Sequence, residues 1–318
     1  MKRLLVLLLV FPTLLIFSVT YRLAENQPAD YPTTLADIFF ADVVRQMTNG
    51  RIDIQVYYGG QLGSETETIQ QTMAGVIQFN RVNAAPLASF VDSLSVLSLP
   101  FLFSSEEHLW KVLYGQVGEK LLDSMKSSGL IGLTYFDSGA RSFFTRKTPI
   151  LKPDDLKGLK IRVQNAPVFV EMVKLLGGTP IVMEYGQVYT GLQTGVIDGA
   201  ENNIPSYYTM SFYQVAPHYS FNMHSMVPEI LFMNLATWNS LSKEDQLIIK
   251  TAAHAASLYQ RKLWADRTKA NMEALKAAGA NFYYPTPEDL KLFQKAVQPL
   301  YQKYDKYKDI IDAIMNTK

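Results

Sequence analysis

The chain has 318 residues, 48% hydrophobic and 19% charged, which is enough for two globular domains and excludes a disordered protein. Its 30 basic and 29 acidic residues give a formal net charge of +1, so we expect no nucleic-acid partner. Because cysteine is absent, disulfides, thiolate nucleophiles, thiolate metal sites and lipid attachment to an N-terminal cysteine are excluded.

The amino terminus predicts an export signal over residues 1–20. Met1, Lys2 and Arg3 are followed by a leucine-rich apolar stretch that runs to about Val19, as in a secretory signal peptide. We therefore expect a periplasmic protein. The residues before position 21 are small but do not form an A-x-A cleavage site, so retention of this segment as a membrane anchor remains an alternative.

Strand and helix patterns then alternate, which favours a parallel-type α/β architecture. The predicted strands of a first lobe cover residues 21–24, 51–57, 76–79 and 129–136, and the predicted helices cover 33–48, 65–73 and 108–127. A domain boundary is expected near residues 137–139. The first lobe is predicted to comprise residues 21–138 together with 225–260.

A second lobe is predicted over residues 139–224. Its expected strands lie at residues 141–146, around Arg162 and near Gly199, and its expected helices at 168–176 and 187–194. The chain then returns to the first lobe. Apolar residues at helical spacing predict one long helix within residues 241–280, and residues 281–318 are expected to form C-terminal helices that pack on the lobes.

Arg162 is the strongest candidate for a binding residue. It lies between Ile161 and Val163 near the carboxyl end of a predicted strand, which is where open α/β sheets bind ligands. Its guanidinium is always charged, and its planar fork of donors suits a carboxylate. The alternative is a surface arginine whose aliphatic stem covers apolar neighbours.

Several runs of sequence resemble the solute-binding proteins of tripartite ATP-independent periplasmic (TRAP) transporters, the DctP-like family. These runs are DLKGLKIRV at 155–163, YTGLQTGVIDGAEN at 189–202, GGQLGSETE at 59–67, APLASF at 85–90, LPFLF at 99–103 and DSGARSF at 137–143. The resemblance implies a two-lobed α/β periplasmic-binding-protein fold with a hinge and a long helix that spans both lobes. It also implies a monomer that delivers a small organic acid to a small and a large membrane subunit.

The same resemblance implies roles for individual residues. Arg162 would pair with the ligand carboxylate, and Asn202 would bind the same group. Arg141 corresponds to a second arginine that faces the cleft, although it could instead be a solvent-facing strand residue. Tyr185 corresponds to an aromatic residue against the ligand or belongs to the core. Asn165 is a candidate from its position alone: it lies three residues past Arg162, at the tip of the predicted strand, and is either a ligand contact or a turn former.

Residues of the first lobe suggest which acid is bound. Glu25 and Asn26 follow the first strand, and Arg81 and Asn83 lie on one face of a strand, where Arg81 could alternatively pair with a surface acid. Glu229 could accept hydrogen bonds from sugar hydroxyls. Together with the runs AENNIP at 200–205 and HSMVPE at 224–229, these residues resemble the sugar-acid branch of the family, and we expect a uronate such as D-glucuronate or D-galacturonate.

Other functions remain open at this stage. A C4-dicarboxylate ligand within the same family, a binding module that serves a sensor kinase, and a secreted enzyme acting on sugar acids are the alternatives. The four histidines have no metal-binding spacing, and the chain has no nucleophile-elbow, P-loop or dinucleotide-binding motif. We therefore expect no metal, no cofactor and no catalysis.

Overall fold

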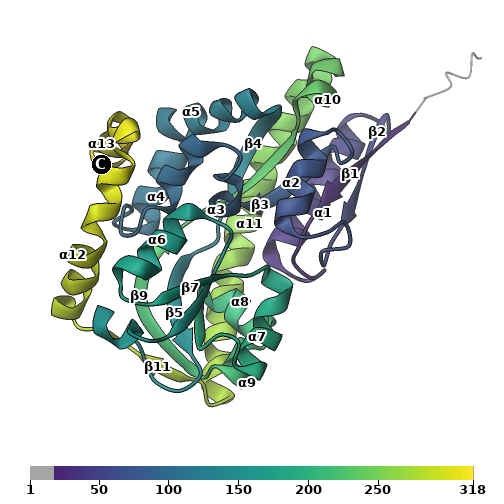
Figure 1. The fold of residues 1–318 in the computed structure, drawn as a ribbon. Coiled ribbons are helices and arrows are strands. Elements are labelled where there is room, and N and C mark those ends of the chain that lie inside the picture. The colour runs from purple at the N-terminus through teal and green to yellow at the C-terminus, as the bar shows by residue number, and fades with distance from the viewer. Residues whose placement is uncertain (1–17, 318) are drawn as a thin grey trace, which may run out of the picture.

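The computed structural model describes residues 18–317, which fold into two α/β lobes, each built on its own sheet (Figure 1). Most of the predicted export signal lies outside the described residues. Its last two residues, Val19 and Thr20, already belong to the first strand, where they pair with Ile52 and Asp53. Within residues 18–317, no helix has both the length and the apolar character needed to cross a membrane.

The sheet of lobe I has the strand order β2-β1-β3-β10-β4. Its strands are β1 (Val19–Ala24), β2 (Ile52–Tyr57), β3 (Phe79–Asn83), β4 (Leu130–Phe136) and β10 (Glu229–Asn234). Its helices are α1 (Pro32–Met47), α2 (Glu65–Met73), α3 (Ala84–Leu87), α4 (Glu106–Leu113), α5 (Gln116–Ser124) and α10 (Leu235–Ser240). Helix α1 buries Ala36, Phe40 and Val44 against one face of this sheet, as expected for an amphipathic helix.

The sheet of lobe II has the strand order β11-β9-β5-β8-β6-β7. Its strands are β5 (Ala140–Thr145), β6 (Lys160–Val163), β7 (Thr179–Val182), β8 (Gly199–Asn202), β9 (His218–Met226) and β11 (Asn281–Tyr283). Its helices are α6 (Pro167–Leu175), α7 (Val188–Thr194), α8 (Ile204–Thr209) and α9 (Phe212–Val215).

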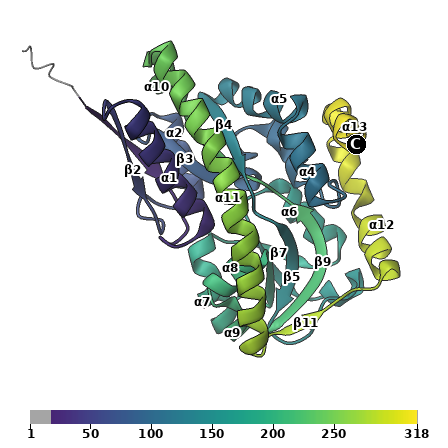
Figure 2. The same ribbon diagram turned by 180° about the vertical axis from the view of Figure 1, so that it is seen from behind.

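The long helix α11 (Lys243–Ala277) joins the lobes at the back of the molecule, as predicted (Figure 2). It contacts α1 and β4 in lobe I and α8 in lobe II, and 35 residues correspond to a length of about 50 Å. Helix α12 (Pro287–Lys303) contacts α6, and α13 (Lys308–Met315) contacts α5. The C-terminal helices therefore touch elements of both lobes.

The sheets are mixed rather than purely parallel. In lobe I, β10 is antiparallel to both β3 and β4, and in lobe II, β5 is antiparallel to both β8 and β9. Strands β5 and β10 are the ones that the chain enters directly from the other lobe, through residues 137–139 and 227–228. Because the chain reaches each sheet from the side of the cleft, β5 and β10 run antiparallel to their neighbouring strands.

Two predicted elements were wrong in detail. The helix expected at residues 108–127 is divided into α4 and α5, because the chain turns tightly around Gly115 and Gly118. A Cβ on Gly118 would lie 2.0 Å from the Leu113 carbonyl oxygen. Strand β3 begins at Phe79 and not near Val76, because Gly75, with φ +75°, forms a turn just before it. The strand consequently contains both Arg81 and Asn83.

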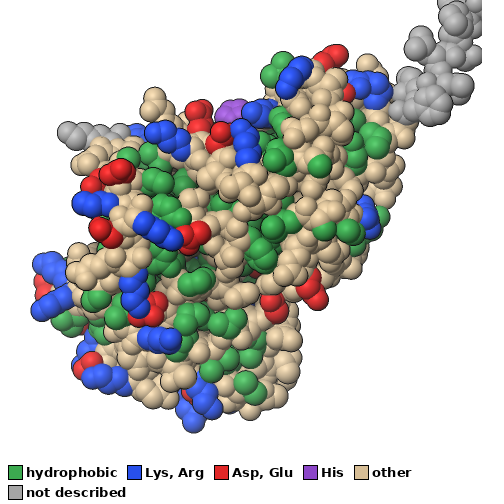
Figure 3. Space-filling model, turned by 45° about the horizontal axis from the view of Figure 1, so that its top comes forward, with side chains coloured by type: hydrophobic (Ala, Val, Ile, Leu, Met, Phe, Trp, Pro, Cys, Tyr) green, Lys and Arg blue, Asp and Glu red, His purple; other side chains and the backbone are tan. Residues whose placement is uncertain are grey.

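The surface agrees with the nearly balanced charge of the sequence. Acidic and basic side chains are interspersed on the face drawn in Figure 3, and neither sign forms a continuous field there. The concentrated charge of this protein lies instead in its interior, where Arg81, Arg141 and Arg162 are each at most 3% exposed.

Candidate ligand-binding site

A small polar cavity lies between the lobes, beside the strand ends that face the cleft. Lobe I contributes Asn26, Gln27, Tyr31, Glu65, Asn83 and Glu229 to its wall, and lobe II contributes Arg141, Gln164, Tyr185, Asn202, Asn203 and Ser206. Its volume is about 20 Å³, enough for about one water molecule and far below the roughly 300 Å³ or more of a typical ligand pocket. The described conformation is therefore closed.

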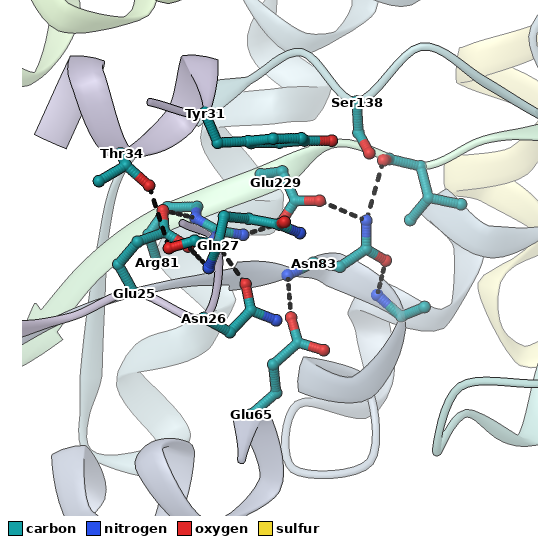
Figure 4. A network of polar contacts seen from close by, with 12 residues as sticks. Glu25, Asn26, Gln27, Tyr31, Thr34, Glu65, Arg81, Asn83, Ser138 and Glu229 are labelled. Carbon is teal, nitrogen blue, oxygen red and sulfur yellow. Dashed lines mark hydrogen bonds and ion pairs between the residues drawn. The ribbon is translucent and has the colours of Figure 1, made fainter. Parts of the chain in front are cut away.

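Arg81 of β3 is the centre of a buried network in lobe I (Figure 4). Its Nε donates to Glu25 at 2.8 Å, its Nη1 to Glu229 at 2.6 Å and its Nη2 to Asn26 at 2.8 Å. Its Nη2 also forms an ion pair with Glu25. All three guanidinium nitrogens of Arg81 are thus occupied by protein groups, and Asn83 completes the network by donating to Glu229 at 3.0 Å.

Arg141 of β5 forms the corresponding pair in lobe II. Its Nε and Nη2 donate to the two carboxylate oxygens of Glu201 at 2.5 and 2.9 Å, a bidentate contact between two buried groups. Its Nη1 donates to Asn202 Oδ1 at 3.1 Å. That oxygen also accepts from the backbone N–H of Asn203 at 2.9 Å, whereas the amide nitrogen of Asn202, a residue of the cavity wall, forms no hydrogen bond with the described residues.

Arg162 of β6 differs from the other two arginines because no carboxylate of the described residues forms an ion pair with it. Its Nε donates to the carbonyl oxygen of Met183 at 2.8 Å, and its terminal nitrogens form no hydrogen bond with the described residues. Burial lowers the pKa of Arg162, and the nearby charge of Glu201 opposes that shift. Arg162 lies beside the small cavity and not on its wall.

Burial and charge divide the carboxyl groups around the cavity into two kinds. Burial, reinforced by the charge of Glu229, raises the pKa of Glu65 to about 8 and that of Asp37 well above its usual range. Burial acts in the same direction on Glu201, but Arg141 and His224 outweigh it and lower the pKa of Glu201 to about 2. At neutral pH, Glu65 therefore carries a proton that it can donate, whereas Glu201 is a carboxylate.

Three further side chains on the cavity wall have a buried polar atom without a hydrogen-bond partner among the described residues. These atoms are Gln27 Oε1, Gln164 Oε1 and Tyr185 Oη. A buried polar group without a partner is costly, so such groups are natural contacts for a polar ligand. Glu65, Gln27 and Gln164 were not predicted, although Gln27 follows β1 and Gln164 follows β6 at strand ends where binding residues are expected.

An outer pocket of about 560 Å³ adjoins the small cavity and shares Asn26, Glu65 and Tyr185 with it. At the rim of the cleft, Thr66 of lobe I donates to Glu184 of lobe II at 3.1 Å and accepts from Asn165 at 3.4 Å. Asn165 is exposed and lines neither space. Deeper in the cleft, the hydroxyls of Tyr31 and Ser206 form a hydrogen bond of 2.9 Å between the lobes.

The predicted site residues therefore occupy three kinds of position. The cavity wall includes Asn26, Asn83, Arg141, Tyr185, Asn202 and Glu229. Glu25 and Arg81 lie behind this wall, where Arg81 pairs with buried acids and not with a surface acid. Arg162 lies beside the cavity, and Asn165 belongs to the contact at the rim. Contact of each of these residues with a ligand stays a prediction.

Comparison with known proteins identifies the family. Residues 23–307 match the family model described as bacterial extracellular solute-binding protein, family 7, DctP. A solute-binding protein of Chromohalobacter salexigens is 39% identical over 277 residues, which cover 87% of this chain and 82% of the relative.

Solved structures agree with this match. A TRAP periplasmic solute-binding protein of Xanthobacter autotrophicus, solved with bound β-D-galacturonate, is 42% identical with a TM-score of 0.91 and covers 94% of this chain and 100% of its own. The corresponding protein of Roseobacter denitrificans, solved with bound β-D-glucuronate, is 36% identical with a TM-score of 0.92 and the same coverage. The resemblance found in the sequence is confirmed: the chain belongs to the DctP family of bacterial extracellular solute-binding proteins, those of TRAP transporters.

Proposed function

We propose that this protein captures a hexuronate, D-galacturonate or D-glucuronate, in the periplasm and delivers it as a monomer to the small and large membrane subunits of a TRAP transporter. The observation that carries the proposal is the difference among three buried arginines. Arg81 and Arg141 are occupied by protein carboxylates, whereas Arg162 has no carboxylate partner among the described residues. The carboxylate of the ligand would supply the negative counter-charge for the guanidinium of Arg162.

The proposed pose places the carboxylate on the terminal nitrogens of Arg162 and on the amide nitrogen of Asn202. Charge-assisted hydrogen bonds contribute about 1.5 to 3 kcal/mol each, whereas micromolar affinity needs about 8 kcal/mol in total. The remainder must come from the sugar hydroxyls. The polar cavity wall offers both acceptors, such as Glu229 and Gln164, and donors, such as the protonated carboxyl of Glu65.

The arrangement favours a sugar acid over a C4-dicarboxylate. A dicarboxylate presents a second charge that needs a second free cation, and Arg81, the arginine at the lobe I side of the cavity, is already bound by Glu25 and Glu229. The two similar structures with a bound uronate support the same ligand class.

The arrangement also favours binding over catalysis. An enzyme that acts on sugar acids would need a free acid–base pair. Three acids at the cleft that could supply such a pair, Glu25, Glu201 and Glu229, are tied to arginines: Glu25 and Glu229 to Arg81, and Glu201 to Arg141. We therefore propose that the protein performs no chemistry, and that export by its amino-terminal segment brings it to the periplasm.

A thermal-shift comparison tests the proposed ligand class. A ligand that binds only the folded state raises the melting temperature by mass action. D-galacturonate and D-glucuronate are each expected to raise the melting temperature of the purified protein more than succinate or malate at the same concentration. A larger shift with a C4-dicarboxylate would overturn the uronate assignment and leave the family membership intact.

A further inference from the structure

The lobe I end of the cavity holds more negative charge than positive charge. Arg81 provides one positive charge, and it contacts the carboxylates of both Glu25 and Glu229. The other groups around this pair, Asn26 and Asn83, are uncharged amides. The nearby carboxyl of Glu65 has its pKa raised to about 8 by burial and by the charge of Glu229, so at neutral pH it is uncharged and leaves the balance of charge around Arg81 unchanged.

The geometry also prevents Arg81 from serving a second acid. Its three nitrogens all donate to protein oxygens, and the residue is 1% exposed. Glu229, in contrast, lies on the cavity wall, whereas Glu25 and Arg81 lie behind it. A neutral hydroxyl can donate a hydrogen bond to it, whereas a second carboxylate would face a like charge in a desolvated site.

We propose that Glu25 and Glu229, by saturating Arg81, form a charge filter that admits acids with a single carboxylate and excludes hexarates, which carry a carboxylate at both ends. This inference rests on the proposed function, since it assumes that Arg162 holds the first carboxylate. It assigns Glu229 a role in specificity beyond hydrogen bonding: the same side chain accepts from a hydroxyl and repels an acid.

The test compares three acids of the galactose series by calorimetry at neutral pH. D-galacturonate is a cyclic monocarboxylate, D-galactonate is an open-chain monocarboxylate and galactarate is an open-chain dicarboxylate. The measured quantity is the affinity for galactarate relative to D-galacturonate, with D-galactonate as the control for an open chain. For the unmodified protein we expect galactarate to bind at least about tenfold more weakly than D-galacturonate.

Glu229→Gln removes the repelling charge and keeps a side chain of the same shape. It is expected to increase the relative affinity for galactarate about tenfold and to leave that for D-galactonate within about twofold. Glu25→Gln removes the other charge from Arg81 and is expected to act in the same direction, which provides a second variant if the first does not fold. Glu107→Gln, at an exposed position of α4 that lines neither space of the cleft, also removes one negative charge and is expected to leave the relative affinities unchanged.

The outcomes separate the inference from the proposed function. Equal affinity of the unmodified protein for galactarate and D-galacturonate would overturn the charge filter alone. The charge filter would also be overturned if the Glu229→Gln and Glu25→Gln proteins fold but keep the relative affinity for galactarate unchanged. It would likewise be overturned if the affinity for D-galactonate rose as much as that for galactarate. If the folded, unmodified protein binds none of the three acids, the proposed function is wrong and the filter falls with it.

Discussion

The Nε of Arg162 donates a hydrogen bond of 2.8 Å to the carbonyl oxygen of Met183. This contact joins the end of β6 to the segment that follows β7, and it fixes the plane of the guanidinium. The two terminal nitrogens are then preset as a fork, so less side-chain entropy is lost when a carboxylate binds.

Arg162→Lys is expected to weaken hexuronate binding at least about tenfold, because lysine keeps the charge but loses the planar fork. Calorimetry with D-galacturonate measures the change. The matched control is Arg146→Lys, the same substitution at the residue that follows the last residue of β5 in lobe II. Arg146 lines neither space of the cleft, and this variant is expected to leave the affinity unchanged. Unchanged binding by the Arg162→Lys protein would remove Arg162 from the site.

Glu201→Gln is expected to lower the free energy of unfolding by about 3–5 kcal/mol, because it leaves the buried charge of Arg141 without its bidentate partner. Denaturant unfolding measures the loss. The control is Glu171→Gln, which breaks the more exposed pair with Lys303 and is expected to cost at most about 1 kcal/mol. Equal losses in the two variants would show that Arg141 does not depend on Glu201.

Glu65 predicts a dependence of stability on pH. Its pKa is about 8 in the folded state and near 4.5 when unfolded, so the folded state binds an extra proton between these values. Its contribution to stability is complete below about pH 4.5 and is lost as the pH rises through about 8.

Glu65→Gln imitates the protonated form and removes this dependence. Melting temperatures measured from about pH 5 to about pH 9 should therefore fall more steeply for the unmodified protein than for the Glu65→Gln protein. The comparison isolates Glu65, because Asp37, whose pKa burial also raises, is present in both proteins. Parallel curves would mean that Glu65 is ionised in the folded protein.

The sequence predicted the fold and the strand that carries Arg162 well, because both depend on local patterns. The alternation of apolar and polar residues around Arg162 and the long run of apolar residues at helical spacing in α11 are local signals. The structure contains both the strand and the helix that they predict. The partners of the arginines could not be predicted in the same way. Arg81 lies 56 residues from Glu25 and 148 residues from Glu229, and nothing in β3 alone indicates that two acids meet it.

The same reason explains the residues that were missed or placed differently. Glu65 resembles an ordinary acidic residue in the first turn of a helix, and only the fold reveals that it is buried against Asn83. Asn165 does follow its strand as predicted, but the closed lobes place it against Thr66 at the rim. Contacts between the lobes depend on how the two lobes pack together, and the periodic pattern of apolar residues in the sequence does not determine that packing.

Lobe closure is expected to depend on ligand. The small cavity and the bond between Tyr31 and Ser206 identify the described conformation as closed, and a sugar acid can enter only if the lobes separate. Small-angle scattering should therefore give a larger radius of gyration for the ligand-free protein than with saturating D-galacturonate. Identical profiles would contradict opening of the cleft in the free protein.

The most direct test of the central claim is a crystal structure of the unmodified protein grown with D-galacturonate. The account predicts one sugar acid between the lobes, with its carboxylate on the terminal nitrogens of Arg162 and the amide nitrogen of Asn202, and with a hydroxyl toward Glu229. Arg81 is expected to keep its contacts with Glu25 and Glu229. A carboxylate bound to Arg81, or a sugar acid bound elsewhere on the protein, would contradict the account.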